Sequence, residues 1–388
     1  MLRIASATLA LCLSPAAVFA VSDGHFDTAR QGCEKSDYTY DQKDVDHPGD
    51  GCETITAQGG PAESNDFVRS GIDHATIVDL GPRSTSGAPL NLAHRGTGVN
   101  TAANPYPENT LASFIHAVDV EGADGVELDV QVALNNGNAD PFDELVLMHD
   151  ESLNRTTTCR SPLPVDDCAA NRTSEDIRVS CVPLNGSGET ERAGIFDQQV
   201  VPTLREALDA IVRGRGKYVN IEIKNQPPTD PDSQREGCNS GEPLNVSSLA
   251  IDLLVAEYTA AERALVILSS FNPFAAAAAK HEAAVLGAPL DVGLLVIPLR
   301  DAASPQFPDA TYAAIFAAAA GLDAIHPHEK EATAEAVGFA RSLGLAVRPW
   351  TVNERCGMRR LIDLGVDAII TDEPDRLAAE LVTPSICP

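Results

Sequence analysis

From about Asn91 onward, the chain alternates between short apolar runs and longer stretches with apolar residues at three- and four-residue spacing. The short runs predict strands and the longer stretches predict helices. Strands are expected at Leu90–Ala93, Gly125–Val130, Glu144–Met148, Tyr218–Ile223, Ala264–Ser269, Val292–Ile297, Ala324–His326, Ala346–Trp350 and Ala368–Thr371. Helices are expected at Thr110–Glu121, Leu204–Arg213, Ser247–Tyr258, Pro273–Leu286, Tyr312–Ala319, Ala332–Leu343 and Glu354–Leu364. This alternation predicts an α/β fold with a parallel sheet closed into a (β/α)₈ TIM barrel.

Nine predicted strands are one too many for an eight-stranded barrel. The segment between Val130 and Glu144 is too short for a crossover helix, which with its turns needs about a dozen residues. We therefore interpret Gly125–Val130 and Glu144–Met148 as a hairpin-like extension around Asn135-Asn136-Gly137. One of the two strands is expected to lie outside the barrel proper.

Two polar stretches interrupt the alternation, at about residues 154–200 and 226–245. Both contain cysteine, and both follow strands that end in chemically active groups. We expect loops over the barrel mouth, stiffened by disulfides because they lack a core of their own. Residues 21–90 are polar, acidic and rich in Gly, Asp and Ser. They predict a loop-rich N-terminal arm that packs on the barrel domain, residues 91–388.

The first 20 residues predict a secretory signal peptide cleaved after about Ala20, with Arg3 before an apolar run. That run is too short to span a membrane. Its removal leaves eight of the nine cysteines, an even number that favours disulfides in an exported protein. Among the pairings, Cys33–Cys52 and Cys159–Cys168 are favoured as short local loops. The mature protein is therefore expected to be secreted or periplasmic.

The chain is strongly acidic, with 56 Asp and Glu against 28 Lys and Arg and a formal net charge of −28. Such a field repels nucleic acid and anionic membrane surfaces. We therefore expect neither a nucleic-acid partner nor stable membrane insertion, and the oligomeric state stays open. A small phosphate ester would also be repelled unless local cations attract it.

Glu127 and Asp129 are the sharpest local feature. Because they lie two apart in a strand, their carboxylates point to the same face, and Val126 and Leu128 point to the other. Two acids on a buried face repel each other unless a cation compensates. A hard divalent cation with oxygen ligands would do so; the alternative is a solvated strand face.

Glu222 and Lys224 share one face of the strand Tyr218–Ile223 and its end, so Glu222 is a third candidate metal ligand and Lys224 a candidate phosphate partner. The alternative is a buried structural ion pair. His94 and His149 each follow an apolar run at a predicted strand end. Imidazoles titrate near neutral pH and suit acid and base roles. His326 and His328 are secondary candidates with an equally good structural interpretation.

Taken in order, these motifs resemble the glycerophosphodiester phosphodiesterase family. The likeness covers about Asn91–Leu381, and eight ordered matches carry far more weight than one short motif. They include His94-Arg95-Gly96, Pro107-Glu108-Asn109-Thr110, Glu127-Leu128-Asp129-Val130, His149-Asp150, Ile221-Glu222-Ile223-Lys224, Ser270-Phe271, Trp350-Thr351-Val352-Asn353 and Thr371-Asp372-Glu373-Pro374.

The resemblance implies a TIM barrel that hydrolyses glycerophosphodiesters, small-molecule substrates, to glycerol 3-phosphate and an alcohol. It implies that Glu127, Asp129 and Glu222 hold a divalent cation, Ca²⁺ or Mg²⁺, and that His94 and His149 are the acid/base pair. The remaining implied site residues contact the phosphate, the glycerol or the leaving group, or orient the first loop: Arg95, Lys224, Trp350, Phe271 and Glu108.

Two alternatives stay open. One is a phospholipase D-like enzyme acting on lysophospholipid or sphingomyelin, which would want an apolar patch near the mouth. The other is a catalytically silent barrel used for binding, which the presence of both His and all three acids disfavours.

Overall fold

The computed structural model describes residues 87–101, 104–134, 141–159, 168–184, 199–224, 244–297 and 307–387. The chain divides into two units, Met1–Asp79 and Leu80–Pro388, and every described residue belongs to the second. The predicted signal peptide, nearly all of the N-terminal arm, the pairing Cys33–Cys52 and most of the insertion at 226–245 lie outside the described residues. Within the described part of the chain, no helix has the length and apolarity needed to span a membrane.

Eight parallel strands form the barrel, in the order β10-β9-β8-β7-β6-β2-β1-β11. The amides of Asp367 and Ile370 donate to the carbonyl oxygens of Val347 and Pro349 at 2.9 Å, which joins the two ends of this order. The strands are β1 (Leu90–Ala93), β2 (Gly125–Val132), β6 (Tyr218–Ile223), β7 (Val266–Ser270), β8 (Asp291–Val296), β9 (Ala324–Pro327), β10 (Ala346–Val347) and β11 (Ala368–Thr371). The predicted (β/α)₈ barrel is confirmed.

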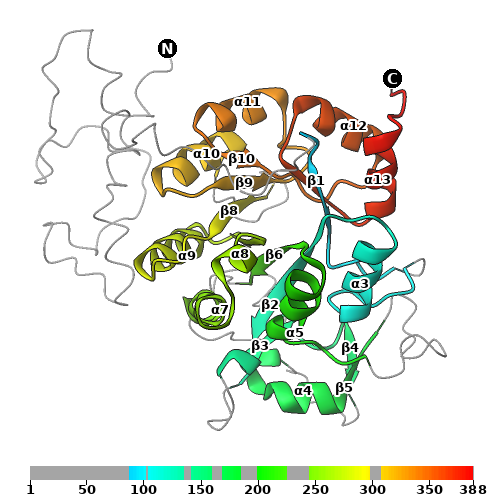
Figure 1. Ribbon diagram of the computed structural model, residues 1–388, viewed down its shortest axis with the longest axis vertical. Helices are drawn as coiled ribbons and strands as arrows, with labels where there is room; N and C mark the ends of the chain where they lie inside the picture. Colours follow the sequence, from blue (N-terminus) through cyan, green and yellow to red (C-terminus); the bar gives the residue numbers. More distant parts are fainter. Residues whose placement is uncertain are drawn as a thin grey trace, which may run out of the picture. The chain divides into compact units, whose positions relative to one another are not determined.

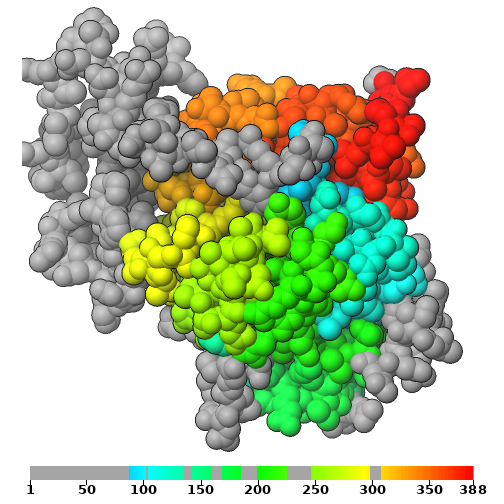
Figure 2. Space-filling view, in the orientation of Figure 1, coloured from blue at the N-terminus to red at the C-terminus, as the bar shows by residue number. Residues whose placement is uncertain are grey.

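Helices follow the strands and surround them (Figure 1). They are α3 (Leu111–Asp119), α5 (Leu204–Leu208) with its continuation η4 (Asp209–Arg213), α7 (Leu244–Glu257), α8 (Ala260–Arg263), α9 (Pro273–Val285), α10 (Ala310–Ala319), α11 (Ala334–Ser342), α12 (Arg355–Leu364) and α13 (Pro374–Val382). Helix α13 was not predicted. It packs beside β1, so the first and last units of the barrel adjoin, cyan beside red in Figure 2.

Local sequence fixes where several helices begin. The hydroxyl of Thr203 accepts from the amide of Glu206, whose carboxylate accepts from the amide of Thr203, a capping box at the start of α5. Thr110 and Thr333 cap α3 and α11 through the same hydroxyl-to-amide bond. Each cap satisfies an amide that the first helical turn cannot pair.

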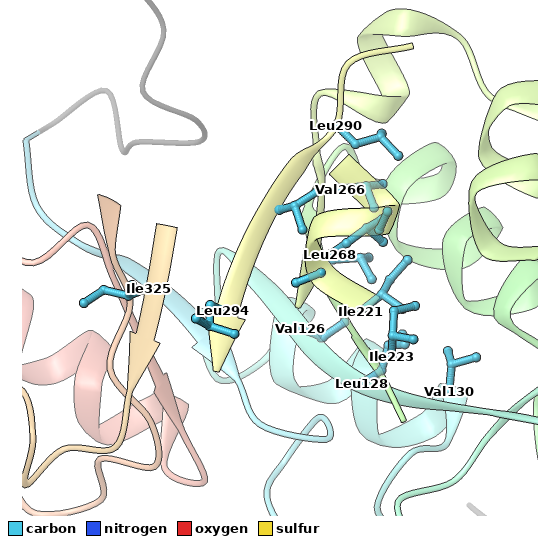
Figure 3. Close-up of a cluster of buried hydrophobic side chains, with 14 of the residues drawn as sticks. Val126, Leu128, Val130, Ile221, Ile223, Val266, Leu268, Leu290, Leu294 and Ile325 are labelled. Carbon is cyan, nitrogen blue, oxygen red and sulfur yellow. The ribbon is translucent and has the colours of Figure 1, made fainter. Parts of the chain in front are cut away.

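The main core lies between the strands and the helices. Val126 and Leu128 of β2 and Ile221 and Ile223 of β6 point outward into it, together with the inner faces of the helices (Figure 3). Each such side chain contributes about 1.5–3 kcal/mol when removed from water. Because strand side chains alternate, this outward apolar face sends the intervening polar residues into the barrel.

Strand β3 (Leu145–Leu147) lies outside the barrel and pairs antiparallel with the far end of β2, Val130 opposite Leu147. The prediction that one of nine strands would be surplus is therefore confirmed. The β2–β3 extension carries His149 back toward the end of the barrel where β2 holds Asp129, since the amide of Met148 donates to the Asp129 carbonyl at 3.1 Å.

The insertion at 154–200 differs from its prediction because part of it is buried in a small second core. There Ala169, Ile177 and Cys181 of the insertion pack with Val146 and Met148 from the β2–β3 extension. Its described elements are β4 (Thr157–Cys159), η3 (Ala169–Asn171), α4 (Ser174–Ser180) and β5 (Cys181–Pro183).

The predicted disulfide Cys159–Cys168 is wrong. Strands β4 and β5 pair antiparallel with Cys159 opposite Cys181, and the bond joins those two residues, whose Cα atoms are 3.9 Å apart. A preference for the shortest loop missed this hairpin register. A second disulfide joins Cys356 at the start of α12 to Cys387 in the C-terminal tail.

Arg348 is the largest fully buried side chain among the described residues. Its Nη1 and Nη2 donate to Oδ1 and Oδ2 of Asp291 at 2.7 and 2.6 Å, inside the barrel. A buried ion pair of this kind stabilises little by itself, yet removing one partner leaves the other charge without compensation.

Arg348→Met is therefore expected to lower the free energy of unfolding by about 3–5 kcal/mol. Arg348→Met with Asp291→Asn removes the orphaned charge and is expected to recover more than about 1 kcal/mol of that loss. Urea denaturation of the wild type, both single variants and the double variant measures this. A double variant no more stable than Arg348→Met would show that the ion pair is not the cause.

Candidate functional site

The site lies where the first strands of the barrel end. The register of the parallel pair β2 and β6 sets Asp129 directly opposite Glu222, and Glu127 opposite Asn220. All three carboxylates point into the barrel and are buried. One oxygen from each of Glu127, Asp129 and Glu222 lies within 4.8 Å of the other two. The structure thus brings together the three residues predicted as metal ligands.

Two cations compensate part of this negative charge. The Nζ of Lys224 lies 2.9 Å from Oδ1 of Asp129 and 2.6 Å from Oε1 of Glu222, and the Nε of Arg95 lies 3.3 Å from Oδ2 of Asp129. Burial and the neighbouring Asp129 raise the pKa of Glu127 to about 8. Burial acts to raise the pKa of Asp129 as well, but Lys224 and Arg95 hold it well below its usual range.

The three acids fit a divalent cation. Oδ1 of Asp129 and Oε1 of Glu222 are buried and accept no well-aligned hydrogen bond, although the Lys224 ammonium is close to both. A buried carboxylate oxygen without such a bond is costly. Convergent carboxylate oxygens are the donor set that Ca²⁺ and Mg²⁺ prefer.

The loop after β1 folds tightly over these acids. Arg95 adopts a left-handed backbone, with φ of 53°, and its amide donates to Oε2 of Glu127 at 3.0 Å. Asn109 is also left-handed, with φ of 56°; its Nδ2 donates to Oδ2 of Asp129 at 2.8 Å. Gly96 is required, because a Cβ there would lie 2.2 Å from Oγ of Ser113. Such strained backbone persists only where its surroundings enforce it.

Each of the two predicted catalytic histidines is paired with a carboxylate. Nδ1 of His94 lies 2.7 Å from Oδ1 of Asp372, and Nδ1 of His149 lies 2.6 Å from Oδ1 of Asp150. Because a carboxylate accepts, each pairing places a proton on Nδ1 and leaves Nε2 for other chemistry. Nε2 of His94 is 3.9 Å from Oε2 of Glu127.

The two imidazoles differ in their electrostatic surroundings. Burial and Lys224 lower the pKa of His149 to about 4, against the opposing pull of Asp129 and Asp150. Burial and Arg95 also act to lower the pKa of His94, but Asp372 and Glu127 outweigh them and raise it. Groups whose environments push their pKa values apart are suited to separate acid and base roles.

Asp372 is a site residue to which sequence reasoning gave no role. It follows β11, and besides His94 it accepts from Nδ2 of Asn353 at 2.7 Å and from the amide of Val99 at 3.1 Å. The sequence did contain an indication of this role, because an acid directly after the last strand faces the end of β1 once the barrel closes.

Glu108 is held between two arginines, and only 1% of its side chain is exposed. Oε1 accepts from Nη1 of Arg95 at 2.9 Å and from Nη2 of Arg155 at 2.8 Å. The structure therefore places Glu108 where it can orient the arginines of the first loop and the insertion.

The predicted aromatic residues also meet. The centroids of the Phe271 and Trp350 rings are 5.2 Å apart in an edge arrangement, and those of His328 and Trp350 are 5.3 Å apart, also in an edge arrangement. His326 instead lies wholly inside the barrel, with its Nε2 3.3 Å from Nη1 of Arg348. Both secondary histidines contact Trp350, His328 through its ring and His326 through its carbonyl oxygen, which accepts from Nε1 of Trp350 at 2.7 Å.

Comparison with known proteins places this geometry in a family. Residues 94–376 match the glycerophosphoryl diester phosphodiesterase family. A glycerophosphodiester phosphodiesterase from Caldanaerobacter subterraneus subsp. tengcongensis is 30% identical over 288 residues, which cover 74% of this chain and 96% of that protein.

Solved structures share the fold. A phosphodiesterase described as a glycerophosphoryl diester phosphodiesterase from Silicibacter pomeroyi has a TM-score of 0.58 at 22% identity, over 77% of this chain and 95% of that one. An Oleispira antarctica phosphodiesterase, solved in complex with the product sn-glycerol-3-phosphate, has a TM-score of 0.55 at 22% identity, over 77% and 98%. With the family matched from His94 through the residues that follow the last strand, this chain belongs to the glycerophosphoryl diester phosphodiesterase family.

Proposed function

We propose that the protein hydrolyses glycerophosphodiesters to glycerol 3-phosphate and an alcohol, using a divalent cation and two histidines. The observation that carries this proposal is the meeting of three buried carboxylates, Glu127, Asp129 and Glu222, beside two histidines that are each paired with an acid. Membership of the family and the glycerol-3-phosphate complex of the Oleispira antarctica protein support the substrate class.

Glu127, Asp129 and Glu222 would hold the cation, which we propose to be Ca²⁺ or Mg²⁺ because both prefer oxygen ligands. When bound, such an ion acts as a Lewis acid that polarises a phosphoryl oxygen. Arg95 and Lys224 add two fixed positive charges beside the acids. Together they would let a substrate anion approach a chain whose net charge is −28.

His94 and His149 move the protons. One accepts the proton of the attacking oxygen, and the other donates to the leaving alkoxide. Asp372 and Asp150 fix both rings through Nδ1, so that Nε2 carries the transfer in each case. Trp350 and Phe271 would line the space for the glycerol or the leaving alcohol, since Phe271 follows β7, the strand beside β6, and its ring packs against Trp350.

We also propose that the protein is exported after cleavage at about Ala20. The charge and apolarity of residues 1–20 support this, as do the disulfides Cys159–Cys181 and Cys356–Cys387, which persist in oxidising compartments.

The first test of the function is release of glycerol 3-phosphate from a panel of glycerophosphodiesters, with Ca²⁺, with Mg²⁺ and with chelator. Cation-dependent release is expected, because the acids alone repel the substrate anion. Glu127→Ala is expected to abolish both turnover and the cation-dependent rise in thermal midpoint. Chelator-insensitive turnover by that variant would refute the metal assignment. Cleavage of lysophospholipid or sphingomyelin alone would indicate the phospholipase D-like activity instead.

A second test separates proton transfer from cation binding. His149→Ala is expected to lower turnover by about 10²–10⁴-fold, as for loss of a general acid or base. The cation-dependent thermal shift should remain, because His149 is not among the three converging ligands. His281→Ala, on helix α9, is the matched control and should keep full turnover. An active His149→Ala variant would remove this residue from the mechanism.

Export is tested by the intact mass of the protein from cells that produce the whole chain. We expect a product that begins near Val21, in the medium or periplasm, with Cys159 and Cys181 protected from alkylation. A cytoplasmic product that retains Met1 and reacts at both thiols would contradict the proposal.

A further inference from the structure

Arg155 links two acids that serve different parts of the site. Its Nη1 and Nη2 donate to Oε2 and Oε1 of Glu108 at 3.1 and 2.8 Å, a two-pronged contact. Its Nη2 also donates to Oδ1 of Asp150 at 2.9 Å, and its Nε donates to the other oxygen of Asp150. All three guanidinium nitrogens are therefore engaged.

Each of these acids holds a residue that acts on substrate in the proposed mechanism. Asp150 fixes His149 through Nδ1 at 2.6 Å. Glu108 accepts from Nη1 of Arg95 at 2.9 Å, and the Nε of Arg95 in turn lies 3.3 Å from Asp129. A continuous chain of polar contacts thus runs from His149 through Arg155 to the metal-ligand cluster.

The insertion supplies Arg155 and holds its backbone. Arg155 lies at the start of this insertion, four residues before Cys159, which the disulfide to Cys181 ties down. The hydroxyl of Thr157 donates to the carbonyl of Leu153 at 2.6 Å and closes the turn around Arg155. Besides the Arg155–Glu108 contact, one further hydrogen bond joins the insertion to the first loop: Nδ2 of Asn100 donates to the carbonyl of Leu184 at 2.9 Å.

The planar shape of the Arg155 guanidinium matters more for this contact than its positive charge alone. The Glu108 and Asp150 side chains are 1% and 11% exposed, so each is costly unless it is paired. Arg155 is 43% exposed, and solvent weakens its bare Coulombic attraction. A planar guanidinium can bridge two carboxylates in fixed directions, whereas a lysine ammonium acts as a single point charge.

We propose that Arg155 is a positioning residue that sets His149 and Arg95 together, through Asp150 and Glu108. This inference rests on the proposed function. Without the guanidinium, the carboxylates of Asp150 and Glu108 repel each other and rotate away from their present positions. His149 then loses the bond to Asp150 that orients its Nε2, and Arg95 loses its bond to Glu108.

The test compares Arg155→Met and Arg155→Lys with wild type on glycerophosphocholine, with the cation that supports wild-type turnover. Arg155→Met is expected to lower kcat about 10- to 100-fold, as for loss of a supporting residue, with KM changed less than about threefold. Arg155→Lys should recover only part of kcat. The control is Arg359→Met, which breaks the pair with Asp363 on helix α12 and should change neither parameter.

A second comparison shows whether Arg155 acts through its two acids. Adding Arg155→Met to an Asp150→Asn/Glu108→Gln background should lower kcat less than about threefold. In that background the neutral Asn and Gln side chains no longer form the charged contacts with Arg155. The same large loss in that background, an unchanged kcat in Arg155→Met, or loss of the cation-dependent thermal shift would each overturn the inference. An inactive wild type on all glycerophosphodiesters would instead refute the proposed function.

Discussion

Three carboxylates held together in a buried site form the constraint on which the rest of this site depends. The register of β2 and β6 forces Asp129 against Glu222, and the two-residue period of β2 adds Glu127 on the same face. Arg95 and Lys224 supply two positive charges for three negative ones. Burial, together with the negative charge of Asp129, raises the pKa of Glu127 to about 8. A divalent cation resolves such an imbalance by the same chemistry that activates a phosphoryl oxygen.

The surroundings of the acids are organised outward from this cluster. The first loop is tied to the acids by the strained residues Arg95 and Asn109, which donate hydrogen bonds to Glu127 and Asp129. The β2–β3 extension returns His149 to the same end of the barrel, and β11 brings Asp372 to His94. His94 is therefore fixed by an acid that only the closed barrel brings near, whereas His149 is fixed by Asp150, its neighbour in sequence. This arrangement explains why the chemistry needs the whole barrel rather than one motif.

Much of this could be predicted from sequence, for physical reasons. Period-two alternation placed Glu127 and Asp129 on one face, and the short link before Leu145 excluded a crossover helix. Contacts that depend on register or closure could not be predicted. Cys159 pairs with Cys181 because β4 and β5 align them, not because the loop is short. The contacts of Asp372 with His94 and of Arg155 with Glu108 likewise join residues far apart in sequence.

The central claim is that the three acids hold a divalent cation. Its most direct test is a structure from crystals grown with Mn²⁺ and glycerol 3-phosphate, with anomalous data collected near the manganese edge. The account predicts one strong anomalous peak in contact with Glu127, Asp129 and Glu222, with the Lys224 ammonium moved from between Asp129 and Glu222 toward the phosphate. The account would be contradicted by crystals in which millimolar Mn²⁺ gives no peak there and Lys224 still bridges the two acids.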